Sequence, residues 1–287
     1  MSDTPDTNSV PIPVTKDIVH RLGLEARKHV QLLIENTRIF DKDVENSFPR
    51  LRNSEIRFGP VLGRGGYCVV SEIASIAVKS PMEKPLYDEE ELQRRALAER
   101  CIRNGDARYA IKTLGDHTRS DAINYMKGVM DLAIEAKFLA VVRHSNIIRM
   151  RAVADCSPYD DGYFLVLDRL YGTLDDRLSQ WEKEEAKAKG LVSKISGKYK
   201  KKINESITKR MVAAYDISRA MMHFHKNNII YRDLKPENIG FDIRNDVKIF
   251  DLGLAKEIHE EERLPDGTYN LTGLTGSLRY MVSSFPP

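Results

Sequence analysis

The stretch 229–253 constrains this chain more than any other part of its sequence, because it places two polar turns between short β-type runs. The first turn, at 231–238, carries Asp233 and Asn238, and the second begins at Asp251. Either aspartate alone could be an acidic residue in a surface turn. The full set, in this order and at this separation, would rarely arise by chance and indicates a functional site.

These residues resemble the signature of protein kinases. The run 231–238 fits the catalytic loop H-R-D-L-x-x-x-N with Tyr231 in the His position, and 251–253 fits D-F-G with Leu252 in place of Phe. By the order of its motifs the chain is similar to eukaryotic-type serine/threonine protein kinases over roughly 56–281. The resemblance implies an α+β, two-lobed fold, with a β-rich N-lobe that includes the αC helix and an incomplete helical C-lobe.

The resemblance also implies a role for each polar residue of the two turns. Asp233 would orient the substrate hydroxyl and accept its proton, and Lys235 would stabilise the γ-phosphoryl group. Lysine at that position is the pattern of Ser/Thr rather than tyrosine kinases. Asn238 and Asp251 would hold Mg²⁺, a hard cation that prefers oxygen ligands. ATP and Mg²⁺ are therefore the predicted cofactors, and a protein with Ser or Thr hydroxyls is the predicted substrate.

A Gly-rich segment at 62–70 is predicted to lie against the ATP phosphates, because glycine lets backbone amides approach them closely. The kinase template G-x-G-x-x-G-x-V fits this segment except at the third glycine, where Cys68 stands, and Gly66 supplies flexibility nearby. The family's hinge between the lobes corresponds to 168–170. The residues predicted to contact the nucleotide are Leu62, Gly63, Gly65, Gly66, Val70, Ala110, Lys112, Asp168 and Leu170.

Two lysines compete for the role of the phosphate-binding lysine of the V-A-I-K motif. Lys79 lies nearer to the Gly-rich segment, but Lys112 ends the better match and leads into a predicted αC helix that runs to about residue 142. We therefore predict that Lys112 binds the phosphates and pairs with Glu135, so that both belong to the catalytic set. Lys79 is predicted to be a surface lysine.

The resemblance divides the chain into a tail, an N-lobe and part of a C-lobe. The tail would carry one or two helical segments, which could be a docking helix or a surface helix packed on the main domain. A Lys- and Glu-rich insertion in the C-lobe is expected to be a solvated loop or a frayed helix before a long helix at 206–226. The predicted parts are 1–54, 55–168 with an insertion at about 83–106, and 169–287 with an insertion at about 182–204, ending inside the activation segment.

The activation segment follows the family pattern to Met281 and then departs from it before the A-P-E motif. In the family, the helices beyond that motif form the base of the lower lobe. We therefore expect exposed apolar surface on the helix at 206–226, low stability and little or no kinase activity for this chain alone. Activation-segment phosphorylation is expected at Thr272 or Thr275, where a phosphate could meet Arg232.

Composition excludes several other classes of protein. The net charge of +3 is too weakly basic to indicate nucleic-acid binding. There is no apolar run of about 18 residues to span a membrane, and the N-terminus lacks the features of a signal peptide. Three dispersed cysteines without metal-like spacing fit a reducing compartment. We expect a cytoplasmic protein, with a nuclear location also open, and the sequence does not indicate its oligomeric state.

Two other functions compete with catalysis. A pseudokinase-like protein would bind a nucleotide or a partner without transferring phosphate, but Lys112, Asp233, Asn238 and Asp251 are all present, which favours a catalytic ancestry. A dinucleotide-binding oxidoreductase could also use a Gly-rich turn. That turn should open a helix, whereas 68–73 favours a strand.

Overall fold

The computed structural model describes residues 15–79, 89–188, 198–271 and 275–280. The chain divides into two compact units, each built from several segments. The first unit comprises Met1–Asn36, Ser47–Ile134 and Arg151–Leu167. The second comprises Thr37–Asn46, Glu135–Met150 and Asp168–Pro287.

The first unit contains a six-stranded sheet with the strand order β1-β7-β8-β6-β3-β2. Strand β3 pairs antiparallel with both β2 and β6, whereas β1 pairs parallel with β7. The Gly-rich segment lies at the turn between β2 and β3, as the sequence predicted. The strands are β1 Arg50–Leu51, β2 Ile56–Arg64, β3 Cys68–Ile76, β6 Tyr109–Leu114, β7 Met150–Ala154 and β8 Phe164–Asp168.

Burial in this sheet follows strand position. The central strand β8 is buried along Phe164, Leu165, Val166 and Leu167, which explains its uninterrupted apolar sequence. The edge strand β2 is exposed along most of its length. The Gly-rich turn therefore extends from an edge that has few packing constraints of its own.

The predicted insertion of the N-lobe folds as a helix followed by a hairpin. Helix α3 (Glu89–Glu99) is anchored by Arg94, which makes buried ion pairs of 2.5 Å with Glu55 and 3.0 Å with Glu91. The hairpin joins β4 (Ile102–Arg103) to β5 (Asp106–Ala107). Its two turn residues both have positive φ, the backbone of a two-residue turn that asparagine and glycine favour.

Two long helices of this part of the chain meet in a small core. Helix α4 (Ala122–Val141) is the predicted αC helix, and its first N–H groups are capped by the Asp121 carboxylate, 3.1 Å from the backbone nitrogen of Ile123. Helix α1 (Lys16–Leu33) buries Ala26 against α4. The sequence therefore predicted both helices, and α1 is packed on the main domain.

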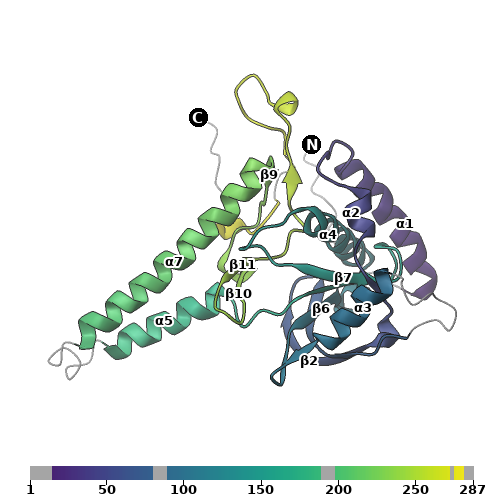
Figure 1. Cartoon of the computed structure of the whole chain (residues 1–287). Helices are drawn as coiled ribbons and strands as arrows, with labels where there is room; N and C mark the ends of the chain where they lie inside the picture. The colour runs from purple at the N-terminus through teal and green to yellow at the C-terminus, as the bar shows by residue number, and fades with distance from the viewer. Residues whose placement is uncertain (1–14, 80–88, 189–197, 272–274, 281–287) are drawn as a thin grey trace. The chain divides into compact units, whose positions relative to one another are not determined.

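Two long helices also dominate the second unit. Helices α5 (Leu174–Ala188) and α7 (Lys198–Lys226) lie side by side (Figure 1), and Glu185 of α5 accepts hydrogen bonds from Ser206 and Arg210 of α7. Of the two alternatives predicted for about 182–204, the helix extension is the one that the structure shows where it describes this stretch, because both helices extend into it. Lysine and glutamate favour helix. Residues 189–197 lie outside the described part.

The remaining elements of the second unit are short. Two antiparallel pairs, β9 with β12 and β10 with β11, flank the turns that carry the predicted catalytic residues. The elements are α2 Lys42–Asn46, β9 Ile229–Ile230, β10 Ile239–Phe241, β11 Val247–Ile249 and β12 Lys256–Glu257. The 3₁₀ helices of the chain are η1 Asn53–Glu55, η2 Asp116–Ser120, η3 Pro236–Asn238, η4 Glu260–Glu262 and η5 Leu278–Tyr280.

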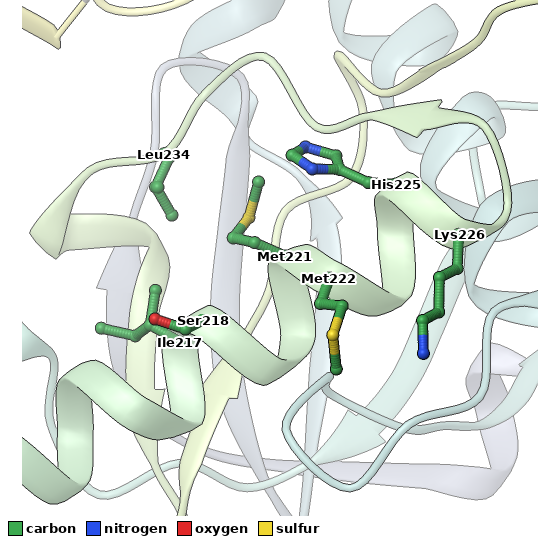
Figure 2. A pocket seen from close by; sticks show the side chains of 7 residues that line it. All are labelled: Ile217, Ser218, Met221, Met222, His225, Lys226 and Leu234. Carbon is green, nitrogen blue, oxygen red and sulfur yellow. The ribbon is translucent and has the colours of Figure 1, made fainter.

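Helix α7 carries the exposed apolar surface that the sequence predicted. Met211 is 67% exposed and Met222 51% exposed. Near the C-terminal end of α7, a groove of about 630 Å³ is lined by residues of this helix and by Leu234 of the catalytic loop (Figure 2). Among the helices of the described ranges, none combines the length and the apolarity needed to cross a bilayer.

Candidate active site

The β10–β11 hairpin brings the two predicted metal ligands to the same end of the second unit. Asn238 directly precedes β10, and Asp251 follows β11. The antiparallel pairing of Ile239 with Ile249 continues in a hydrogen bond of 3.1 Å from the Phe250 backbone N–H to the Asn238 carbonyl. Asp251 has φ of 64°, a left-handed conformation that is uncommon outside glycine and often marks functional turns.

The Asp233 side chain lies at the centre of a hydrogen-bonded cluster. Its Oδ2 atom accepts a hydrogen bond from Asn238 Nδ2 at 2.7 Å and lies 2.8 Å from Lys235 Nζ. Its Oδ1 atom accepts the backbone N–H of Ser277 at 3.0 Å and the Ser277 hydroxyl at 2.8 Å. Asp233 is only 8% exposed, so these charge-assisted bonds form largely away from water. The structure thus brings the predicted Asp233, Lys235 and Asn238 together.

Ser277 is a site residue that sequence reasoning missed. Its hydroxyl donates to Asp233 and accepts a hydrogen bond of 2.8 Å from Lys235 Nζ. The signal that could have found it is its place in the T-G-S run of the activation segment. Of the two predicted phosphorylation sites, Thr275 is half-buried and Thr272 lies outside the described residues.

The hydroxyl of Tyr231 lies close enough to three of the predicted acidic residues for their charges to affect its pKa. It is fully buried, and its hydroxyl donates to the Phe250 carbonyl. Burial raises the pKa of Tyr231 well above its usual value, and the negative charges of Asp251, Asp233 and Glu135 raise it further. Tyr231 therefore stays neutral, and three predicted site carboxylates of the second unit lie within electrostatic reach of one hydroxyl.

The predicted metal ligands have the chemistry that Mg²⁺ requires. Asn238 directs its amide nitrogen to Asp233, which leaves its oxygen as the atom that could contact a cation. Asp251 supplies a carboxylate. Within the described ranges, no group of three or more His, Cys, Asp or Glu residues could hold a metal. Two protein oxygens suit Mg²⁺, which usually keeps water and substrate phosphates among its ligands.

The first unit aligns three of the predicted nucleotide-binding residues across three strands. Gly63 of β2 pairs with Val70 of β3, and Val70 pairs with Lys112 of β6. A Cβ atom added at Gly63 or Gly66 would meet nothing within 4 Å, and neither residue needs a positive φ. The fold itself therefore does not require glycine at these positions, which fits a loop that a phosphate group approaches closely.

A hydrogen bond from η2 holds the tip of this loop. His117 Nε2 lies 2.9 Å from the Gly66 carbonyl, so this nitrogen carries the proton. Within the turn, the Gly65 N–H donates to the Cys68 carbonyl at 2.8 Å. Cys68, which stands in place of the third glycine, is buried. His117 is a second residue that the sequence did not indicate.

Lys79 and Lys112 differ in their surroundings. Lys112 lies within β6 and is partly buried, whereas Lys79 is exposed beyond the end of β3. The backbone N–H of Lys79 donates to the Glu55 carboxylate at 2.8 Å. Because Lys112 belongs to the first unit and Glu135 to the second, the pairing between them stays a prediction.

The predicted site residues divide between the two units. Those in the first unit are Leu62, Gly63, Gly65, Gly66, Val70, Ala110 and Lys112. Those in the second unit are Glu135, Asp168, Leu170, Asp233, Lys235, Asn238 and Asp251. Leu170 packs closely on Gly240, where an added Cβ would lie 2.6 Å from Leu170 Cδ1.

A sheet unit with a Gly-rich hairpin, together with a helical unit that carries this acidic cluster, defines the two-lobed fold of protein kinases. The protein kinase domain family matches residues 96–283, more than half of the chain. The chain therefore belongs to the protein kinase family, as its catalytic-loop residues predicted. The match begins beyond the Gly-rich segment, so the interpretation of that segment depends on its own motif and on the strand register.

Curated relatives are protein kinases as well. The cAMP-dependent protein kinase type 3 of Saccharomyces cerevisiae is 31% identical over 179 residues, which are 62% of this chain and 37% of that protein. Protein kinase 2 of Dictyostelium discoideum is 29% identical over 168 residues, 58% of this chain and 29% of the relative. The G protein-coupled receptor kinase 2 of Drosophila melanogaster is 43% identical over 69 residues, 24% of this chain and 9% of the relative. The chain thus spans well under half the length of these relatives.

Proposed function

We propose that this chain is an ATP- and Mg²⁺-dependent protein kinase that phosphorylates serine and threonine, against the expectation from its activation segment that the chain alone has little or no activity. The observation that supports this most is the Asp233 cluster. There a serine hydroxyl, that of Ser277, lies between the Asp233 carboxylate and the Lys235 ammonium group. A carboxylate that accepts the proton of an aliphatic hydroxyl, beside a cation that faces its oxygen, is the arrangement that phosphoryl transfer to serine or threonine requires.

In the proposed reaction the chain supplies positioning and charge. Asp233 holds the substrate hydroxyl and accepts its proton, and Lys235 balances the negative charge on the transferred group. Asn238 and Asp251 would hold Mg²⁺, which would neutralise charge on the phosphates of ATP.

The nucleotide would be held mainly by the first unit. The amides of Gly63, Gly65 and Gly66 would contact the phosphates, and Lys112, oriented by Glu135, would bind them directly. The side chains of the remaining predicted contacts would enclose the base and line the hinge. These are Leu62, Val70, Ala110, Asp168 and Leu170.

We place the protein in the cytoplasm or the nucleus, acting on protein substrates. None of Cys68, Cys101 and Cys156 forms a disulfide within the described residues, and burial raises the pKa of Cys101 and of Cys156 to about 11. Thiols that form no disulfide suit a reducing compartment.

The test is to measure the thermal transition of this chain with Mg-ATP, and with ATP in excess EDTA, alongside γ-phosphate transfer to a generic protein. We expect stabilisation by Mg-ATP that EDTA removes and that Asp251→Asn largely abolishes. Asp246→Asn, an exposed aspartate in the β10–β11 turn, is the matched control and should behave as wild type. Stabilisation that stays at the wild-type Mg-ATP value in excess EDTA, or in Asp251→Asn, would contradict the metal assignment.

A second candidate is a protein that binds nucleotide and a partner without transferring phosphate. The groove at the C-terminal end of α7 favours it, because an exposed apolar surface of this kind is a common interaction site. Nucleotide-dependent stabilisation without any γ-phosphate transfer would favour this candidate over the kinase.

A further inference from the structure

The chain between α1 and β1 contains a segment, residues 37–46, that belongs to the second unit although most residues on either side belong to the first. We name these residues the N-terminal strap. They include the short helix α2 and precede every predicted site residue in the sequence. The kinase signature motifs do not include them.

The strap binds the beginning of the activation segment through a buried carboxylate. Glu257 of β12 is 8% exposed, and its Oε2 atom accepts the backbone N–H groups of Arg38 at 2.7 Å and of Ile39 at 3.0 Å. The Arg38 side chain also forms an ion pair of 3.2 Å with Glu261. A buried carboxylate that loses its hydrogen-bond donors destabilises the folded state. The bonds to Glu257 therefore stabilise β12 and the strap in their present positions.

The strap also binds the second half of α4. The Phe40 ring packs edge-on against Phe138, with ring centroids 4.9 Å apart. Lys137 Nζ lies 2.8 Å from the Glu45 carboxylate and 5.4 Å from the centroid of the Phe40 ring. Lys137 and Phe138, which touch the strap, follow Glu135 in α4 by two and three residues.

The first half of α4 is contacted by the helix that precedes the strap. In the first unit, Ala26 of α1 packs with Tyr125 and Val129 of α4, and all three side chains are almost fully buried. An alanine side chain at Gly23 would place its Cβ 2.4 Å from the Tyr159 carbonyl, so α1 sits as close to its neighbours as a glycine allows. N-terminal residues therefore hold α4 along its length.

We propose that the N-terminal strap is a positioning element for phosphoryl transfer, which couples α4 to the activation segment. This inference rests on the proposed kinase function. The strap touches the helix that carries Glu135 and the strand that follows Asp251, so displacing it would release both. Phe40, Glu45, Lys137 and Glu257 are its positioning residues, and none of them is among the residues predicted to contact substrate or nucleotide.

The test is a charge-swap cycle across the partly exposed Glu45–Lys137 pair. Glu45→Lys and Lys137→Glu each place like charges together, and the double variant restores an opposite-charge pair. We expect each single variant to lower kcat about two- to fivefold, with little change in KM for ATP, as for a surface-accessible ion pair worth up to 1 kcal/mol. The double variant should return to within about twofold of wild type. Glu25→Lys, at the exposed Glu25–Lys28 pair of α1, is the matched control and should leave kcat unchanged.

Backbone hydrogen exchange is a second readout, independent of activity. Glu45→Lys should accelerate exchange at 256–262 as well as in the second half of α4, and the double variant should reverse both changes. If exchange at 256–262 stays as in wild type while α4 loosens, the strap does not couple the two elements and the proposal is wrong. If the wild-type chain transferred no γ-phosphate, the kinase proposal would be wrong. The hydrogen-exchange result would still decide whether the strap couples α4 to 256–262.

Discussion

The cluster around Asp233 and the Gly-rich turn at 62–70 differ in how far the protein itself determines their shape. Asp233 is buried and accepts hydrogen bonds from three residues. Contacts within the protein therefore fix the geometry of the cluster that would carry out phosphoryl transfer. The Gly-rich turn extends from an exposed edge strand, and its glycines have open space around them. Preorganised charge lowers a reaction barrier, whereas an open loop gains its order from the ligand.

This comparison predicts two kinds of defect. Substitutions of Asp233, Lys235 or Ser277 should lower kcat and leave nucleotide binding nearly intact, whereas substitution of the proposed metal ligand Asn238 should weaken Mg-ATP binding as well. Substitutions along the Gly63–Val70–Lys112 line should weaken nucleotide binding first. If substitutions around Asp233 mainly weakened nucleotide binding, and substitutions in the Gly-rich turn mainly lowered kcat, this difference between the two regions would be wrong.

The largest effect is expected from Asp233→Asn. The amide cannot accept the substrate proton, and a positioned general base usually contributes about 10²- to 10⁴-fold in rate. We expect kcat to fall by that factor while stabilisation by Mg-ATP stays close to wild type. Steady-state transfer assays and thermal shifts measure the two quantities. A variant with unchanged kcat would remove Asp233 from the mechanism.

A smaller loss is expected from Ser277→Ala, which removes the hydroxyl that joins Asp233 to Lys235. A hydrogen bond to a charged group is worth about 1.5–3 kcal/mol, and 1.4 kcal/mol is a factor of ten. We therefore expect kcat to fall about 10- to 100-fold, and Ser277→Thr, which keeps the hydroxyl, to restore most of it. If both variants were equally impaired, the hydroxyl would not be the group that matters.

On the binding side, Lys112→Met should weaken Mg-ATP binding about tenfold, the equivalent of about 1.4 kcal/mol, because it removes a cation from the phosphates. Lys79→Met is the matched control, since Lys79 is exposed beyond the end of β3. Titration calorimetry with a non-hydrolysable ATP analogue measures both affinities. Weakened binding in the Lys79 variant alone would transfer the role to that lysine.

The smallest expected effect is a pH dependence of the free energy of unfolding. It arises from His144, which belongs to neither the Asp233 cluster nor the Gly-rich turn. Burial lowers the pKa of His144, which also stacks on His223 with ring centroids 5.0 Å apart and accepts the Asn146 backbone N–H at Nδ1. The folded protein thus disfavours the protonated ring, so the unfolded chain binds more protons and stability falls as the pH drops below about 6.5.

Substituting the ring tests that dependence. His144→Phe keeps an aromatic ring without a titrating nitrogen, and it should flatten the dependence of melting temperature on pH between about 7 and 5. The same substitution at the exposed His20 is the control. A slope that His144→Phe leaves unchanged would assign the pH dependence to other groups.

Much of the catalytic end was predictable because its residues are local in sequence. Asp233, Lys235 and Asn238 lie within one turn, and a short hairpin fixes the place of Asp251, so the motif alone groups them. The strands around the Gly-rich turn were predictable for the same reason.

The missed features depend on contacts between distant stretches or on local propensity. Ser277 reaches Asp233, and Glu257 reaches Arg38, across separations that periodicity and motif spacing do not encode. The sequence left a solvated loop and a helix extension open for about 182–204, because a Lys- and Glu-rich stretch suits both. Pairing with a neighbouring helix decided between them.

The proposed phosphorylation of serine and threonine is tested most directly by identifying the amino acid that receives the phosphate. The chain is incubated with Mg²⁺, γ-labelled ATP and a generic protein substrate, and the product is hydrolysed for phosphoamino-acid analysis. With Lys235 beside Asp233, the account predicts phosphoserine and phosphothreonine, both lost in Asp233→Asn. Phosphotyrosine as the main product, or labelling that survives Asp233→Asn, would contradict it.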